Sequence, residues 1–294
     1  MRSFPGVRPL LLVSLAALAA CSGGLLDGGS RAGTDACDAG PCTVPDSGGN
    51  DGAVIEDPIT KDPIWGCLGN VPPPAVSDPN TPLEHSRRFV GVLHAPLEGL
   101  SVKVCEEYDP ACSQPVAGTP RLTDPNGKVD LTLHRGFRGF LDVASPASDP
   151  IAALIHLVPI PDEDVAATDR TVTWPTLLTK SDLELMMASP GRPLLPDHGH
   201  LFVRTLDCQQ EPAERVFLRL EPISAKTVTF YLDSTGNPSI TQGMTSAKGV
   251  GGAINVPAGS IAVTFSRETG EPIGEQNVII RPGTITYVSL VPTP

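Results

Sequence analysis

Aromatic residues are scarce in this chain of 294 residues, which contains only 2 Trp, 3 Tyr and 8 Phe. Proline and glycine are abundant instead, with 32 and 29 copies, so we expect short strands joined by many turns rather than long helices. No apolar run in the sequence reaches the roughly 20 residues that a transmembrane helix needs. The length allows one large domain or two modest ones.

The known catalytic signatures are also lacking. The sequence has no His-x-x-Glu pair, no HExxH, no G-x-S-x-G elbow and no glycine loop of the kind that holds a phosphate. One cluster, Asp197-His198-Gly199-His200, places two imidazoles on one face of an expected strand, but two ligands do not complete a metal site. We therefore predict that the protein is not an enzyme and has no catalytic residues, no metal and no cofactor.

Basic residues are outnumbered by acidic ones. The 21 Lys and Arg face 33 Asp and Glu, which gives a net charge of −12, and no basic stripe is visible. Such a chain has no electrostatic means of holding a phosphate backbone, so we do not expect a nucleic-acid partner.

The N-terminus carries a clear export signal. Arg2 and Arg8 accompany a short apolar run over residues 10–20, which ends in Leu18-Ala19-Ala20-Cys21. These four residues resemble the lipobox of bacterial lipoproteins. The resemblance implies cleavage after residue 20 and lipidation of Cys21, which would anchor the chain in a membrane. An ordinary signal peptide that happens to end near a cysteine is the alternative.

Behind Cys21, residues 21–62 are rich in Gly, Asp, Ser, Ala and Pro and contain eight acids against two bases. Such a stretch buries too little apolar surface to offset the entropy of ordering, so we predict a flexible acidic linker. Residues 63–86, which include Trp65 and three consecutive prolines, are expected to mark where the chain docks on its first folded unit.

Besides Cys21 the chain has six cysteines: Cys37, Cys42, Cys67, Cys105, Cys112 and Cys208. An even number in an exported chain suggests three disulfides, although six cysteines allow 15 connectivities. Proximity in the sequence favours Cys37 with Cys42 and Cys105 with Cys112, which leaves Cys67 for Cys208. No CxxC doublet occurs, so a zinc site is disfavoured.

Alternation of apolar and polar residues begins after Arg88. Strands are expected over residues 89–93, 100–105, 128–134 and 137–143, with a turn at Thr123-Asp124-Pro125-Asn126-Gly127 and a last strand within 151–160. The turn and the Gly-aromatic step after it resemble the carboxypeptidase-regulatory-like (transthyretin-like) β-sandwich. That module accompanies metallocarboxypeptidases without carrying their zinc ligands, so the resemblance implies a β-sandwich rather than an activity.

The same pattern returns from residue 198, with a second Gly-rich turn near residues 246–259. The predicted fold class is therefore all-β, with two tandem transthyretin-like or Ig-like β-sandwich domains. The expected division is a signal peptide (1–20), a linker (21–62), a docking segment (63–86), one sandwich (87–162), a connector (163–197) and a second sandwich (198–294). The connector holds a short helix with a capping box at Ser181-Asp182-Leu183-Glu184.

Together these features predict a lipoprotein of the bacterial outer membrane, facing the periplasm or the exterior, that is anchored by its lipid. Residue 22 is Ser, and lipoproteins that lack Asp there are generally sorted to the outer membrane. Its sandwiches would present a non-catalytic binding surface for a protein or a glycan. A structural subunit of an envelope complex and an accessory to a hydrolase are the alternatives. The few Trp and Tyr residues count against a glycan.

Overall fold

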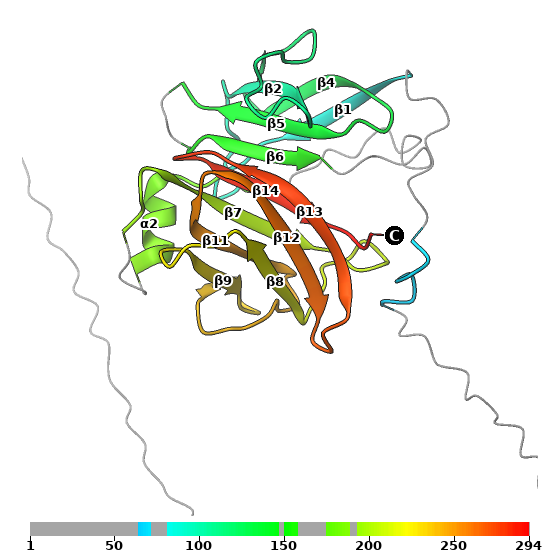
Figure 1. The fold of residues 1–294 in the computed structure, drawn as a ribbon. Helices are drawn as coiled ribbons and strands as arrows, with labels where there is room; N and C mark the ends of the chain where they lie inside the picture. The colour runs from blue at the N-terminus through cyan, green and yellow to red at the C-terminus, as the bar shows by residue number, and fades with distance from the viewer. Residues whose placement is uncertain (1–63, 72–80, 147–149, 158–174, 189–192, 294) are drawn as a thin grey trace, which may run out of the picture. The chain divides into compact units, whose positions relative to one another are not determined.

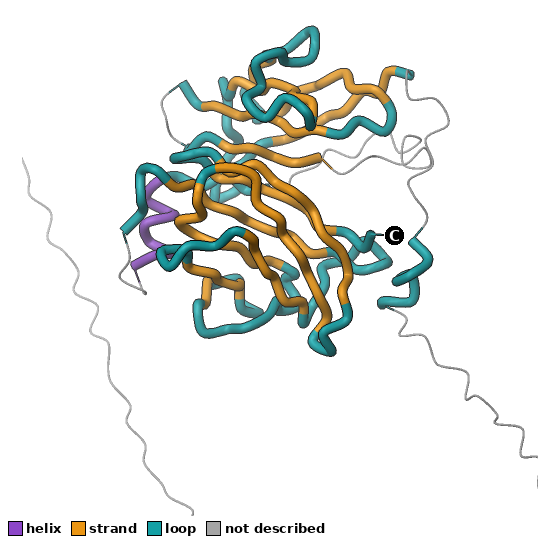
Figure 2. The backbone as a smooth tube through the Cα atoms, in the orientation of Figure 1, coloured by secondary structure: helices purple, strands orange, loops and turns teal. Residues whose placement is uncertain are grey.

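The computed structural model describes residues 64–71, 81–146, 150–157, 175–188 and 193–293. Within these residues the chain is all-β apart from one short helix, which confirms the predicted fold class (Figure 2). No helix in this part of the chain has both the length and the apolar character to cross a membrane. The lipobox, Cys21 and the acidic linker lie outside the described residues, as do residues 163–174 and 189–192 of the expected connector.

The strands follow one another in two groups on either side of helix α2 (Lys180–Ala188). The first group is β1 (Pro82–Arg88), β2 (Ser101–Glu106), β3 (Arg121–Leu122), β4 (Lys128–His134), β5 (Gly139–Ala144) and β6 (Ala153–Leu157). The second group is β7 (His198–Thr205), β8 (Val216–Glu221), β9 (Val228–Leu232), β10 (Pro238–Ser239), β11 (Val250–Pro257), β12 (Gly259–Arg267), β13 (Pro272–Ile280) and β14 (Ile285–Leu290).

A single sheet contains strands of both groups. Its nine strands run in the order β10-β9-β11-β7-β14-β6-β5-β2-β3, and β14 pairs in parallel with β6 on one side and with β7 on the other (Figure 1). A two-stranded sheet, β1-β4, and a three-stranded sheet, β13-β12-β8, complete the described strands. The last strand of the sequence therefore joins the two halves of the fold.

Alternation along β14 divides the hydrophobic core into two clusters. Ile285 and Tyr287 belong to the cluster that includes the apolar residues of β4 and Leu183 of α2. Val288 and Leu290 belong to the cluster that includes β8, β12 and β13. Because successive side chains of a strand point to opposite faces, these two clusters lie on opposite faces of the shared sheet at β14. Each half of the fold thus has two layers, as a β-sandwich requires.

The predicted turn at residues 123–127 is confirmed. One oxygen of the Asp124 carboxylate accepts hydrogen bonds from the N–H groups of Asn126 and Lys128, each at 2.8 Å. Gly127 has a φ of +73°, and a Cβ added there would lie 2.3 Å from the carbonyl oxygen of Phe89. The glycine is therefore required both by the backbone conformation and by the close approach of another loop.

The first strand differs from the prediction. Residues 89–93 do not form a strand, and a turn lies at their end, where His94 N–H donates to the Gly91 carbonyl oxygen at 2.9 Å. The strand is β1, most of which lies in the segment expected only to dock. Alternation in β1 was obscured because two of its buried positions are His85 and Arg87 rather than apolar residues.

The helix and the docking segment show two smaller differences. The N-cap of α2 is Thr179, two residues before the expected Ser181: its hydroxyl accepts from Asp182 N–H at 3.1 Å, and the Asp182 carboxylate accepts from Thr179 N–H at 2.8 Å. Trp65 packs in the cluster built on β8, β12 and β13, with the Arg267 guanidinium 5.9 Å from its ring centroid. The part of the segment around Trp65 thus packs on the later half of the fold, whereas β1 pairs with β4 of the first half.

Candidate functional site

Two of the three expected disulfides fall within the described residues, and both are present. Cys67 is bonded to Cys208 across 141 residues of sequence, and Cys105 is bonded to Cys112 across 7 residues. Cys21, Cys37 and Cys42 lie outside the described residues, so lipidation of Cys21 and a bond between Cys37 and Cys42 remain predictions.

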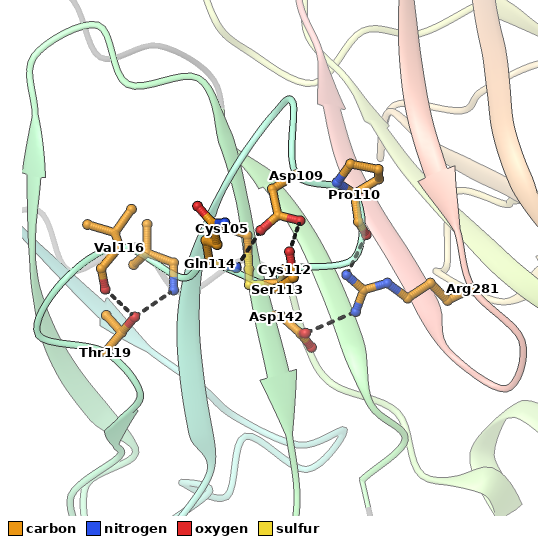
Figure 3. The surroundings of a disulfide bond; sticks show 11 residues. Cys105, Asp109, Pro110, Cys112, Ser113, Gln114, Val116, Thr119, Asp142 and Arg281 are labelled. Carbon is orange, nitrogen blue, oxygen red and sulfur yellow. Dashed lines mark hydrogen bonds and ion pairs between the residues drawn. A yellow bond between two sulfur atoms is a disulfide. The ribbon is translucent and has the colours of Figure 1, made fainter.

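The short disulfide closes a loop over residues 106–111, which we call the braced loop (Figure 3). Asp109 organises it: its carboxylate accepts from Gln114 N–H at 2.7 Å and from the Ser113 hydroxyl at 3.0 Å. These hydrogen bonds, led by the one from Gln114, lower the pKa of the Asp109 carboxyl because they favour its charged form. In addition, Cys112 N–H donates to the Asp109 carbonyl oxygen at 2.9 Å.

Arg281, at the start of the turn between β13 and β14, ties the braced loop to the rest of the fold. Its Nη1 lies 2.9 Å from a carboxylate oxygen of Asp142 on β5, and its Nη2 donates to the Pro110 carbonyl oxygen at 2.7 Å (Figure 3). The guanidinium carbon is also 5.6 Å from the ring centroid of Phe140. One side chain of the later strands therefore contacts both β5 and the loop.

The disulfide lies over a small apolar cluster. Cys105 and Cys112 pack there with Phe140 of β5 and Leu154 of β6, and all four are nearly or fully buried. Ile279 of β13 packs against this cluster, and its N–H donates to His156 Nε2 at 3.5 Å. The braced loop thus rests on a rigid base that several strands share.

The loop presents one aromatic side chain to solvent. Tyr108 is 84% exposed, and it is the only exposed aromatic residue in the part of the chain that the structure describes. Glu107 beside it is exposed too. An exposed tyrosine on a preorganised loop is the kind of group that dominates protein interfaces, because its apolar ring is buried on binding at little entropic cost.

The sulfur atoms of the braced loop do not form a metal site. Cys105, Cys112 and Asp142 place one ligand atom each within 4.8 Å of one another, and they are the only such group of three among the described residues. The two sulfurs are bonded to each other, however, so neither is a thiolate, and the Asp142 carboxylate already pairs with Arg281.

The histidine cluster at the start of β7 has structural contacts. His198 Nδ1 lies 2.8 Å from the Asp197 carboxylate, and His200 Nδ1 accepts from Asn255 N–H at 3.4 Å. His200 is buried, and burial lowers its pKa to about 4. Neither histidine belongs to a group of three ligands in the described ranges.

Sequence reasoning did not single out Tyr108 or Arg281. The pair of cysteines that encloses Asp109 and Pro110 was the available signal for a braced loop, and it indicated the disulfide but not the exposed tyrosine within it. The contact with Arg281 spans 171 residues of sequence, and nothing in the local pattern indicates it.

Comparison with known proteins identifies no relative by sequence: no family model matches, and no curated protein matches. Solved structures that match the chain include a mutant of the shaft pilin spaA from Lactobacillus rhamnosus GG, at 10% identity and a TM-score of 0.25 over 73% of this chain and 99% of that one. A streptococcal ancillary pilin has 13% identity and a TM-score of 0.24 over 72% of this chain and 63% of that one. The Bacillus anthracis TIE protein has 12% identity and a TM-score of 0.23, and this chain, matched over 73% of its length, spans 34% of it.

Proposed function

We propose that this protein is a lipid-anchored, non-catalytic lipoprotein of the bacterial outer membrane that displays a β-sandwich surface to a protein partner. The anchor is Cys21, and the acidic linker over residues 21–62 holds the folded part away from the membrane. The observation that supports a binding role is Tyr108, which is 84% exposed on a loop held by a disulfide, by Asp109 and by Arg281.

A protein partner fits this surface better than a glycan does. Binding of sugars by stacking calls for a row of exposed aromatic rings, and the described residues offer Tyr108 alone. A single ring flanked by the exposed carboxylate of Glu107 suits a partner with an apolar pocket and a basic rim.

Photo-crosslinking in intact cells tests the binding role. A benzophenone amino acid replaces Tyr108 in the full-length chain, and the matched control carries it at Leu185, which is 76% exposed on α2. We expect a discrete crosslinked species at position 108 that is absent at 185 and that disappears when unlabelled wild-type chain is co-expressed in excess. Identical products at both positions, or none at 108, would refute the binding role.

Metabolic labelling with a palmitate analogue tests the anchor separately. We expect the wild-type chain to be labelled and to fractionate with the outer membrane, and Cys21→Ser to lose both properties. Retention of Cys21→Ser in the membrane at the wild-type level would rule out lipid anchoring without bearing on the crosslinking result.

A further inference from the structure

Two basic side chains occupy the inner face of an edge strand. In β1, Leu83, His85 and Arg87 alternate toward the core, with exposed fractions of 8%, 9% and 6%. Their cross-strand neighbours on β4 are Leu133, Leu131 and Val129, which are all apolar. The guanidinium of Arg87 and the imidazole of His85 are therefore enclosed next to aliphatic side chains.

Neither basic group finds a partner in the described part of the chain. Nε and Nη1 of Arg87 and Nε2 of His85 are buried without a hydrogen bond there. Burial lowers the pKa of Arg87 to about 10. The pKa of His85 is lowered to about 4, mainly by burial and to a smaller extent by the charge of Arg87. A buried arginine is normally paired with an anion, because the desolvation of an unpaired charge is strongly unfavourable.

Over the same residues, no strand in the described part of the chain pairs with the outer edge of β1. At one end of β1, Phe89 N–H donates to the Gly127 carbonyl oxygen at 2.8 Å, and at the other end Arg135 N–H donates to the Thr81 carbonyl oxygen at 3.2 Å. Because hydrogen-bonded pairs alternate in an antiparallel ladder, the odd-numbered residues of β1 direct their backbone groups at β4. The backbone groups of Glu84, Ser86 and Arg88 consequently point away from β4. Among the described residues they have no backbone partner.

The next position along this edge shows what it can accept. The Val90 carbonyl oxygen accepts a hydrogen bond from Leu177 N–H at 2.9 Å, and Val90 forms a parallel bridge with Thr176. A single residue therefore already pairs in parallel at the end of the edge, and pairing of the same kind at the remaining positions would add a strand to it.

We propose that the open edge of β1 binds an extended acidic segment of a partner protein, which adds a strand beside Glu84–Arg88 and places a carboxylate against Arg87. Alternate side chains of an added strand face the same side as those of β1, so one Asp or Glu in the correct register reaches the enclosed guanidinium. Arginine and a carboxylate can then form two parallel hydrogen bonds. This site is separate from the braced loop and from Cys21, so its tests do not depend on the function proposed above.

Hydrogen exchange of the free chain is the first test, and β1 supplies its own control. We expect the amides of His85 and Arg87, which face β4, to exchange slowly, and those of Glu84, Ser86 and Arg88 to exchange rapidly. Slow exchange at all five would show that the chain's own residues already cover the edge, and that would overturn the proposal.

Binding of a defined peptide is the second test. The probes are acetyl-TVTDTVT-amide and acetyl-TVTNTVT-amide, titrated into the isotope-labelled chain. We expect the Asp peptide to bind about tenfold more tightly than the Asn peptide and to slow exchange at Glu84, Ser86 and Arg88. Equal binding of both peptides, or no protection at these three amides, would contradict the proposal.

Three variants assign the preference to the enclosed guanidinium. We expect Arg87→Leu to bind both peptides with equal affinity, because it removes the cation and keeps an apolar side chain in the core. Arg87→Lys should retain part of the preference, since it keeps a charge without the two-pronged geometry. Arg88→Leu, which alters an exposed neighbour on the same strand, should keep the full preference. Loss of the preference in Arg88→Leu but not in Arg87→Leu would refute the assignment.

Discussion

Buried histidines make the fold sensitive to mild acid. Burial lowers the pKa of His85, His156 and His200 to about 4, from an ordinary value near 6.5. Between these two values the unfolded chain binds protons that the folded chain does not bind. The free energy of unfolding therefore rises with pH across this window, and the stabilisation is complete above about pH 6.5.

We expect the free energy of unfolding to fall by on the order of 1–3 kcal/mol per buried histidine when the pH is lowered from 7 to 4. Urea denaturation at pH 7, 6, 5 and 4 measures this change. Carboxyl groups whose pKa is lowered, such as those of Asp109 and Asp233, lose their stabilising effect only as the pH falls below about 4. The change in the free energy of unfolding between pH 6 and 5 therefore reports on the histidines. Unchanged stability between pH 7 and 5 would contradict the prediction.

The contribution of Arg281 to the free energy of unfolding can also be measured. Its ion pair with Asp142 is half-buried, with 25% and 18% of the two side chains exposed, and it also holds the Pro110 carbonyl. We expect Arg281→Gln to lower the free energy of unfolding by about 1–3 kcal/mol, because a charge-assisted pair and a loop contact are lost.

Arg219 is the matched control for Arg281, because its ion pair with Glu221 is largely exposed. We expect Arg219→Gln to change the free energy of unfolding by less than about 1 kcal/mol. Chemical denaturation of both variants makes the comparison. Equal losses in the two would show that Arg281 is an ordinary surface residue.

At the scale of elements, the turn before β4 depends on a single glycine. Gly127 combines a φ of +73° with backbone atoms of Phe89 and Leu97 closer than 3 Å to the position of a Cβ. Gly236 also has a positive φ, of +91°, but a Cβ there would meet nothing within 4 Å. Comparing alanine substitutions at the two positions therefore separates the effect of backbone conformation on stability from the effect of steric contact.

We expect Gly236→Ala to lower the free energy of unfolding by about 1 kcal/mol, from the left-handed conformation alone. Gly127→Ala should cost about 3 kcal/mol or more, because the loop at Phe89 must also shift. Thermal or urea denaturation gives both values. Similar losses at the two glycines would argue against a close approach at Gly127.

Local patterns predicted some elements and missed others for identifiable reasons. In β4, Val129, Leu131 and Leu133 alternate with polar residues, and the strand was predicted from that alternation. In β1 the corresponding inward positions include His85 and Arg87, so the pattern reads as polar and the strand was missed. The braced loop followed from its two cysteines, but the exposure of Tyr108 depends on packing that the sequence does not specify.

At the scale of the whole molecule, the shared sheet couples the two halves. β14 pairs with β6 through Ile285, Thr286 and Tyr287 and with β7 along its full length. Neither half can lose β14 without exposing core residues of the other. A parallel pairing of strands this far apart leaves no signal in local sequence, so the expectation of two tandem sandwiches did not include a strand that both share.

We therefore expect the disulfide-intact chain to unfold in one cooperative transition, in which the calorimetric and van't Hoff enthalpies agree. The bond between Cys67 and Cys208, which spans 141 residues, adds to this stability. Its removal in Cys67→Ala/Cys208→Ala should lower the midpoint and cost about 2–5 kcal/mol. Two resolved transitions in differential scanning calorimetry of the wild-type chain would contradict the coupling of the halves.

The position of β14 also orders events during biosynthesis. β6 and β7 emerge from the ribosome well before residues 285–290, yet the seam between them closes only when those residues arrive. The nine-stranded sheet thus cannot be completed before residues 285–290 have left the ribosome. If the chain is exported as we propose, this late closure of the sheet would favour transport of the polypeptide before it has folded.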